Sequence, residues 1–321
     1  MSVLRRALLA AAATVGAGIA GSTLLVPHRV ALPPALGGRR KEFAGRSGML
    51  SCYVDGDGPP LLLLHSINAA ASAYEVRPLA EHLRTRYRVY APDLPGFGFS
   101  ERSQRRYDIA LYLDAVRDVL EVIARDAGDT PVVACAVSLS AEFLARVALE
   151  QPERIAQLVL INPTGFARAY AGPAQPGDRE VPGVHAVVAF PLWSQALYDA
   201  LVSRRSIRYF LERTYGSPAV DEPLIEYDWL TAHQPGARFA PLAFLSGRLF
   251  SRDIQAVYRQ LSVPVFMPHG TRGDFRDFSS ADWARAHERW TVTPFDSGAM
   301  PHFERRAEFN AALDRFLAAR G

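Results

Sequence analysis

Short and solidly apolar runs recur along this chain, and they alternate with segments in helical spacing. Residues 61–65, 131–136 and 155–161 are apolar without alternation, which is typical of strands buried on both faces. Residues 107–127 and 139–149 carry apolar side chains every three or four positions, which predicts helices. Strands that alternate with helices indicate crossover connections. The sequence therefore predicts an α/β fold with a doubly wound, mostly parallel central sheet.

The alternation breaks between residues 166 and 251 and then resumes. The break opens with Pro, Gly and charged residues and continues with helical stretches at 191–202 and 206–215, without a clear buried strand. We expect an inserted helical cap over 166–251 and a core formed by 48–165 and 252–321. Further strands are predicted at 88–91, 263–267 and 291–294, and further helices at 281–290 and 304–319. The apolar residues of the insertion either line a pocket or pack the cap onto the core.

The N-terminus has a composition of its own. Arg5 and Arg6 precede an uncharged stretch of 20 residues, 7–26. Such a stretch fits a signal peptide with a basic start, and it also fits an uncleaved anchor, which needs about 20 apolar residues. Both hypotheses predict a catalytic domain that is exported or anchored outside the cytoplasm, with possible membrane association through residues 7–26. Residues 27–47, with three prolines and a basic cluster, are expected to form a linker.

Composition excludes several classes of protein. Hydrophobic residues make up 49% of the 321 positions, which is enough for a large core. The net charge of +3 is mild and its basic clusters are short, so nucleic-acid binding is not expected. Two distant cysteines, Cys52 and Cys135, do not make a disulfide framework. No histidine pair has metal-ligand spacing with a third ligand nearby, so we expect neither a metal nor a cofactor.

The clearest chemical signal is a serine at the end of a buried strand. Residues 132–137 are apolar, Ser138 follows, and a helical pattern begins at once, with Ala136 and Ser140 two positions on either side. A sharp strand-to-helix turn lifts the serine hydroxyl above the sheet and needs small flanking residues. It also leaves the next backbone N–H, that of Leu139, at a helix start where it can stabilise an oxyanion.

This turn resembles the nucleophile elbow of the α/β-hydrolase superfamily, with Ala136 and Ser140 in place of the usual glycines. The resemblance extends from about residue 48 to the C-terminus apart from the insertion. Residues 61–67 are similar to the strand and His-Gly-x loop of that family, with Ser66 in place of glycine, and residues 90–100 are similar to its Asp-x-Pro-Gly-x-Gly-x-Ser segment. The resemblance implies that the backbone N–H of Ile67 is the second oxyanion donor, and that His65 and Asp93 are structural.

The resemblance also implies a base and an acid late in the chain, in the order Ser, acid, His. Residues 297–304 are similar to the family's histidine loop before the last helix, which makes His302 the expected base. After the strand at 263–267, Gly273 falls where the acid is usual. We therefore expect Asp274 as the acid, with Asp277 as the alternative.

The predicted function is that of a serine hydrolase that cleaves carboxylic ester-type bonds of a small hydrophobic substrate through an acyl-enzyme on Ser138. Two alternatives remain open. The same fold hosts thioesterases, C–C hydrolases, lyases and cofactor-free peroxidases. The altered elbow and Ser66 also leave room for a non-catalytic, membrane-tethered binding protein that keeps the fold.

Overall fold

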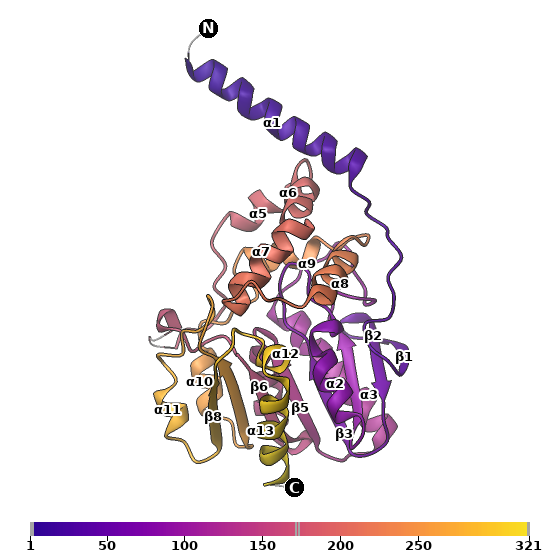
Figure 1. The fold of residues 1–321 in the computed structure, drawn as a ribbon, viewed down its shortest axis with the longest axis vertical. Coiled ribbons are helices and arrows are strands. Elements are labelled where there is room, and N and C mark those ends of the chain that lie inside the picture. Colours follow the sequence, from indigo (N-terminus) through magenta and orange to yellow (C-terminus); the bar gives the residue numbers. More distant parts are fainter. Residues whose placement is uncertain (1–2, 171, 173, 320–321) are drawn as a thin grey trace.

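A computed structural model describes residues 3–170, 172 and 174–319, and leaves the side chains of residues 3–12 and 15 undescribed. One eight-stranded sheet, in the order β1-β2-β4-β3-β5-β6-β7-β8, forms the centre of the molecule (Figure 1). The strands are β1 (Arg39–Gly45), β2 (Gly48–Asp55), β3 (Pro60–Leu64), β4 (Arg88–Asp93), β5 (Val132–Val137), β6 (Ile155–Ile161), β7 (Val265–Gly270) and β8 (Trp290–Phe295). Every pair from β4 to β8 is parallel, so the predicted fold class is confirmed.

The central strands owe their place to their sequence. All the residues of β3, β5 and β7 are buried, and in β6 only Ala156 is exposed. Strands without a polar face are stable only when both faces are covered, as they are in a parallel sheet between two helical layers.

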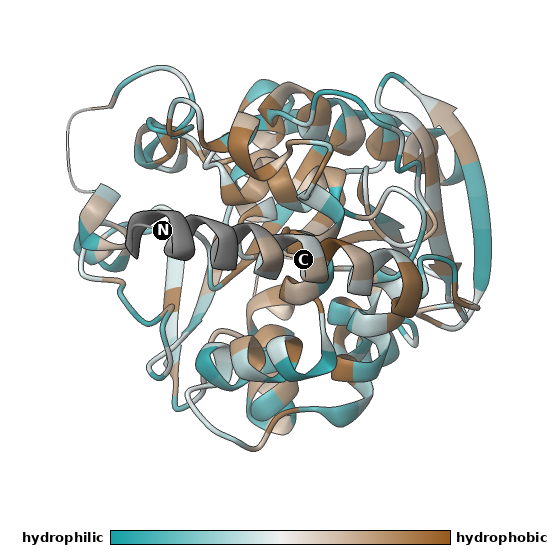
Figure 2. Ribbon diagram, turned by 90° about the horizontal axis from the view of Figure 1, so that it is seen from above, coloured by the Kyte–Doolittle hydropathy of each residue, from teal (hydrophilic) through white to brown (hydrophobic). Residues whose placement is uncertain are grey.

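The antiparallel edge was not predicted. β1 and β2 form a hairpin with Gly45 opposite Gly48, and β2 continues antiparallel against β4. β1 lies within residues 27–47, which we expected to be a linker. Its residues are mostly polar and partly exposed, because an edge strand faces water on one side, and Figure 2 shows this polar colouring at the right edge of the molecule.

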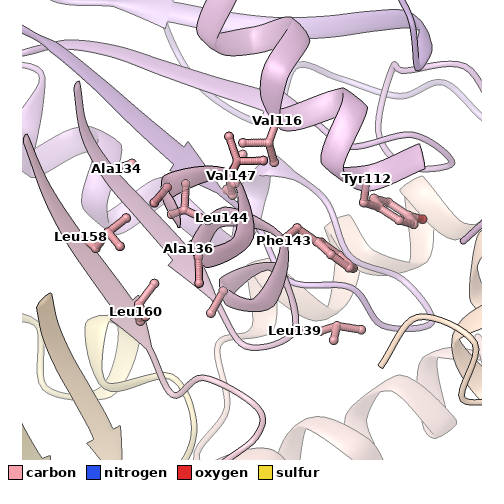
Figure 3. Packing of buried hydrophobic residues seen from close by; sticks show 14 of the residues in the cluster. Tyr112, Val116, Ala134, Ala136, Leu139, Phe143, Leu144, Val147, Leu158 and Leu160 are labelled. Carbon is pink, nitrogen blue, oxygen red and sulfur yellow. The ribbon is translucent and has the colours of Figure 1, made fainter. Parts of the chain in front are cut away.

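Helices cover both faces of the sheet. They are α2 (Arg77–Leu83), α3 (Ile109–Ala127), α4 (Ser140–Glu150), α10 (Ile254–Arg259), α11 (Asp282–Arg285), α12 (Pro301–Glu304) and α13 (Arg306–Ala318). α3 and α4 pack on one face, where Tyr112 stacks on Phe143 and Leu144 lies over Ala136 of β5 (Figure 3). Two predicted helices differ: residues 281–290 are helical only at 282–285, and 304–319 starts at Arg306 after the separate turn α12.

Between β6 and β7 the chain forms a group of helices, here called the inserted helices: α5 (Val184–Val188), α6 (Ser194–Leu201), α7 (Arg204–Tyr215), α8 (Glu222–Ala232) and α9 (Phe239–Leu245). They lie together at one end of the sheet (Figure 1), within the range predicted for an insertion. Several of their apolar side chains face solvent rather than the core, namely Phe190, Leu192, Leu197, Tyr209 and Phe210. These five therefore line no internal pocket.

α1 (Val3–Leu25) extends from the inserted helices away from the rest of the molecule (Figure 1). Its last turn is tied to α6, because the hydroxyl of Ser22 donates to Asp199 at 2.5 Å and Nε2 of His28 lies 2.9 Å from the same carboxylate. The side chains of Arg5 and Arg6, on which the leader hypothesis rests, lie outside the described residues. Within the described part of the chain, no helix has the length and apolar character needed to cross a membrane.

Candidate active site

Ser138 stands at a strained turn between β5 and α4. Its φ of 55° is in the left-handed region, and only Asn162 shares such a φ among the described non-glycine residues. This conformation costs an L-residue on the order of 1–2 kcal/mol, so it persists where the surroundings impose it. The Ser138 N–H donates to Ile161 O at 2.9 Å, and Ser138 itself is partly exposed between buried neighbours. The turn thus has the geometry that the sequence predicts for a nucleophile elbow.

Ser140, the serine in place of the second elbow glycine, forms a buried hydrogen bond. Ser140 is fully buried, and its hydroxyl donates to the backbone carbonyl of His65, at the end of β3. This bond joins the start of α4 to the loop that carries Ile67. Within the described structure, no protein acceptor takes the backbone N–H of Leu139 or Ile67, which leaves both available to a ligand oxygen.

His65 and Asp93 hold loops in place. His65 Nε2 accepts from the Leu94 N–H at 2.9 Å, so its Nδ1 carries the hydrogen that faces Ser66 O at 2.6 Å. Burial lowers the pKa of His65 to about 4, so it is neutral near pH 7. The Asp93 carboxylate accepts from the backbone N–H groups of Ala73 and Phe99, each at 2.9 Å. Neither residue is free for proton transfer.

His302, the expected base, is engaged elsewhere. It lies in α12, is fully buried, and its Nε2 is 2.9 Å from the backbone carbonyl of Glu75. A carbonyl only accepts, so Nε2 carries the hydrogen and Nδ1 keeps the lone pair, which has no hydrogen-bond partner among the described residues. Burial lowers the pKa of His302 to about 4. His302 and Ser138 form no hydrogen bond with each other.

Neither candidate acid forms a hydrogen bond with His302. Asp274 is exposed and pairs with Arg213 Nε at 2.6 Å. Asp277 is exposed as well, and its carboxylate accepts from the backbone N–H groups of Arg168 and Ser279. The structure therefore ties the start of α4, through Ser140, to the loop that carries Ile67, but it does not assemble the predicted triad.

The end of α7 fills the space between the loops that follow β7 and β8. Thr214 O accepts from the Ala299 N–H at 2.9 Å, and Arg213 O accepts from the Asp274 N–H at 3.0 Å. Glycines make this approach possible: a Cβ on Gly273 would lie 2.5 Å from Arg213 O, and one on Gly298 would collide with the backbone of residues 214–215. The inserted helices are thus fastened to the loops that were expected to carry the acid and the base.

Comparison with known proteins decides the family. Residues 61–312 match the Alpha/beta hydrolase family, over more than half of the chain and through both the elbow and the final helices. The chain belongs to the α/β-hydrolase family. This membership confirms the resemblance inferred from residues 61–67, 90–100 and the elbow.

The relatives of this chain include an esterase and a hydrolase of another name. A pimeloyl-[acyl-carrier protein] methyl ester esterase of Nitrosomonas europaea is 29% identical over 246 residues, which is 74% of this chain and 88% of that protein. A 2-hydroxymuconate semialdehyde hydrolase of a Pseudomonas species is 30% identical over 129 residues, covering 40% of this chain and 44% of that protein. A crystal structure of a serine hydrolase involved in carbazole degradation superposes with a TM-score of 0.69 at 18% identity, covering 88% of this chain and all of that one, and shows the shared fold.

Three buried polar groups of this α/β-hydrolase escaped sequence reasoning. Glu75 and Asp228 are almost completely buried, and so is Tyr215. Among the described atoms, Asp228 Oδ1 and the Tyr215 hydroxyl have no hydrogen-bond partner. Burial, then the charge of Glu75, raises the pKa of Asp228 well above its ordinary value. Each lies in a helix, and nothing in the sequence pattern distinguishes it from a solvent-exposed polar residue.

The described residues contain no group of three or more His, Cys, Asp or Glu side chains placed to hold a metal ion. Cys52 and Cys135 are both free and buried, and burial raises the pKa of each thiol.

Proposed function

We propose that this member of the α/β-hydrolase family cleaves carboxylic ester-type bonds with Ser138 as its nucleophile. The observation that carries the proposal is the strained conformation of Ser138, held at the carboxyl end of β5 beside two unused backbone N–H groups. The esterase among the relatives supports an ester as substrate.

The proposed reaction has two steps. Ser138 Oγ attacks the acyl carbon, its proton passes to a base and then to the departing alcohol, and an acyl ester forms on Ser138. Water next attacks this ester, which releases the carboxylic acid and restores the hydroxyl. The N–H groups of Leu139 and Ile67 are proposed to stabilise the oxyanion in both steps. The inserted helices are proposed to act as a cap over a hydrophobic acyl or alcohol group.

His302 remains the proposed base, and its Nδ1, which has no partner among the described residues, is the nitrogen that is free to accept the proton. Its Nε2–H must then leave Glu75 O before it can donate to an acid. Assembly with Asp274 requires that Asp274 leave Arg213 and that α7 withdraw from the loops after β7 and β8. We accordingly propose the triad of Ser138, His302 and Asp274 for an open form of the inserted helices, with Asp277 as the alternative acid.

A second candidate function is that of a binding protein that keeps the fold without catalysis. The engagement of His302 with Glu75 O and of Asp274 with Arg213 favours it, because both predicted partners of Ser138 already have other partners. An oxyanion-binding turn without a base binds an acyl or carboxylate group and does not turn it over.

Covalent labelling with a fluorophosphonate distinguishes the two. The hydrolase proposal expects one modified residue, Ser138, with no labelling in Ser138→Ala and at least a tenfold slower rate in His302→Gln. The binding-protein hypothesis predicts no labelling of the folded wild-type protein, either in buffer alone or with detergent that loosens the inserted helices.

The same assay identifies the acid. If an open form carries the chemistry, Asp274→Asn slows labelling about 100-fold while Asp277→Asn stays near wild type. Wild-type rates in both variants would show that neither Asp274 nor Asp277 assists His302.

Residues 1–26 are proposed to be a leader or an anchor that places the domain outside the cytoplasm. Fractionation of cells that express the full chain or residues 27–321 tests this: we expect membrane association of the full chain alone. Equal distribution of both forms would contradict the anchor.

A further inference from the structure

The loop after β3 is held by one buried carboxylate. Oε2 of Glu75 accepts from the Ser66 N–H at 2.7 Å, while Oε1 accepts from the Ser66 hydroxyl at 3.0 Å and from Asn68 Nδ2 at 2.7 Å. Asn68 in turn donates to the Ser66 hydroxyl oxygen at 2.9 Å and accepts from the Ala70 N–H at 2.7 Å. Residues 66, 68 and 70 are thus fixed around Glu75, with Ile67 between them.

The same residue is linked to the rest of the site. Glu75 lies in the 3-10 helix η1 (Ala73–Val76), and its backbone carbonyl accepts from His302 Nε2. The hydroxyl of Ser140 fastens the elbow helix to His65, the residue just before this loop. The two serines that replace family glycines, Ser66 and Ser140, therefore each use their hydroxyl to tie the oxyanion loop to a neighbour.

We infer that Glu75 is a positioning residue, which acts through Ser66 and Asn68 to aim the backbone N–H of Ile67 at the oxyanion. The inference rests on the proposed function and adds to it a role for a residue that never touches the substrate. A serine in place of glycine restricts the backbone, and the carboxylate selects one orientation of that restricted loop. All three hydrogen bonds are donated to Glu75, so the ionised carboxylate suits the network best.

Burial raises the pKa of Glu75, while the bonds from Ser66 and Asn68 lower it. No ion pair with a cation compensates this carboxylate in the described structure, so its donors are its stabilising partners. A change that removes an acceptor here leaves buried donors unsatisfied.

The decisive variant replaces one hydrogen-bond acceptor of Glu75 with a donor of about the same size. Glu75→Gln places an amide NH₂ against Asn68 Nδ2, so two donors face each other. Adding Asn68→Asp restores the pair, because the new carboxylate accepts from the glutamine and still accepts from Ala70 N–H. This double variant keeps the net charge of the wild type and serves as the rescue.

Asp118 offers a matched control. It is also buried, on α3, and its Oδ2 accepts from both the N–H (2.9 Å) and the hydroxyl (2.7 Å) of Ser47, as Glu75 accepts from Ser66. Its other oxygen, Oδ1, pairs with Arg46 Nε at 3.2 Å, a cation that Glu75 lacks. Asp118→Asn therefore disturbs the same kind of carboxylate-to-serine contact, together with this ion pair, at a place that touches no part of the proposed site.

The first measurement is the second-order rate of fluorophosphonate labelling of Ser138, corrected for the folded fraction. We expect the labelling rate of Glu75→Gln to fall about 10–100-fold, because a displaced N–H donor stabilises the transition state less well while the fold is kept. The Glu75→Gln/Asn68→Asp variant should return to within about threefold of wild type, and Asp118→Asn should stay within about twofold. A Glu75→Gln rate equal to that of Asp118→Asn, or no rescue, would overturn the inference.

The second measurement needs no reaction. Amide hydrogen exchange of the segment 66–72 should quicken in Glu75→Gln, return in the double variant and stay unchanged in Asp118→Asn. If the wild type is not labelled at all, the proposed function fails while this measurement still decides the inference. Unchanged exchange in Glu75→Gln would refute the positioning role.

Discussion

At the scale of single residues, this α/β-hydrolase keeps the sharp turn at Ser138 with unusual residues on either side of it. Ser138 keeps a φ of 55° although Ala136 and Ser140 replace the glycines that usually flank such a serine. The structure accommodates Ser140 because its hydroxyl finds a buried acceptor in His65 O. A polar atom in a tight core costs little when it is hydrogen-bonded, so the substitution is compatible with the turn.

The buried histidine of α12 gives a prediction for the pH dependence of stability. The folded-state pKa of His302 is about 4 against 6.5 for the free side chain. The unfolded chain therefore binds the proton first, so the contribution of His302 is fully present above pH 6.5 and is lost as the pH falls toward 4. We expect this loss to be on the order of 3 kcal/mol in the free energy of unfolding at pH 4.

Urea unfolding of wild type and His302→Gln between pH 4 and pH 7.5 measures this difference. Glutamine keeps an N–H for Glu75 O and does not titrate, so it isolates the histidine from other buried groups such as Glu142, whose pKa burial raises to about 7. Parallel curves for the two proteins would contradict the prediction.

At the scale of elements, α7 packs against the loops after β7 and β8, and the proposed open form requires this contact to break. Four glycines, Gly216, Gly270, Gly273 and Gly298, allow these three backbone segments to approach. The ion pair of Arg213 with Asp274 adds little, since both side chains are about half exposed. Backbone packing rather than charge thus holds α7 in place.

Replacing Gly298 with alanine should loosen this contact. A Cβ there would collide with Thr214 O and Tyr215 Cα, which are backbone atoms that cannot turn aside, so we expect a loss of about 2 kcal/mol or more in the free energy of unfolding. Trypsin should also cleave faster after Arg213. Gly37→Ala is the control, because its Cβ would meet only Asp55 Oδ2 at 3.8 Å, and equal stability of the two variants would contradict the interpretation.

At the scale of the whole molecule, the α/β core and the N-terminal helix are nearly separate. The core is built around the sheet and closed by α13, whereas α1 projects outward and meets the domain through its last turn at α6 (Figure 1). Stability of the domain should therefore depend little on α1.

Deletion of residues 1–26 should change the free energy of unfolding of the domain by less than about 2 kcal/mol, because the contacts described between α1 and the domain are those of the end of this helix with α6. His28 remains in the shortened chain and keeps its contact with Asp199. Urea unfolding in the same detergent for both forms measures the change. A loss several times larger would show that α1 is part of the folded core.

The fold class and a sharp turn between strand and helix at Ser138 are both predictable from local sequence pattern. Solid apolar runs such as those of β3, β5 and β6 alternate with helical spacing along the chain, and this combination favours a buried parallel sheet, so local pattern is sufficient to predict them. The polar edge strand β1 was missed because its stability comes from pairing with β2 and not from its own composition.

The partners of the buried and charged side chains, in contrast, depend on how distant segments pack together. His302 and Asp274 stand in the right order along the chain, yet one donates to Glu75 O and the other pairs with Arg213. A hydrogen bond forms only when its donor and acceptor, here from segments far apart in sequence, are placed to within a few tenths of an ångström. Hydrophobic periodicity depends only on residues that are neighbours along the chain. For the same reason the contacts of Glu75 with Ser66 and Asn68 become visible only in the folded chain.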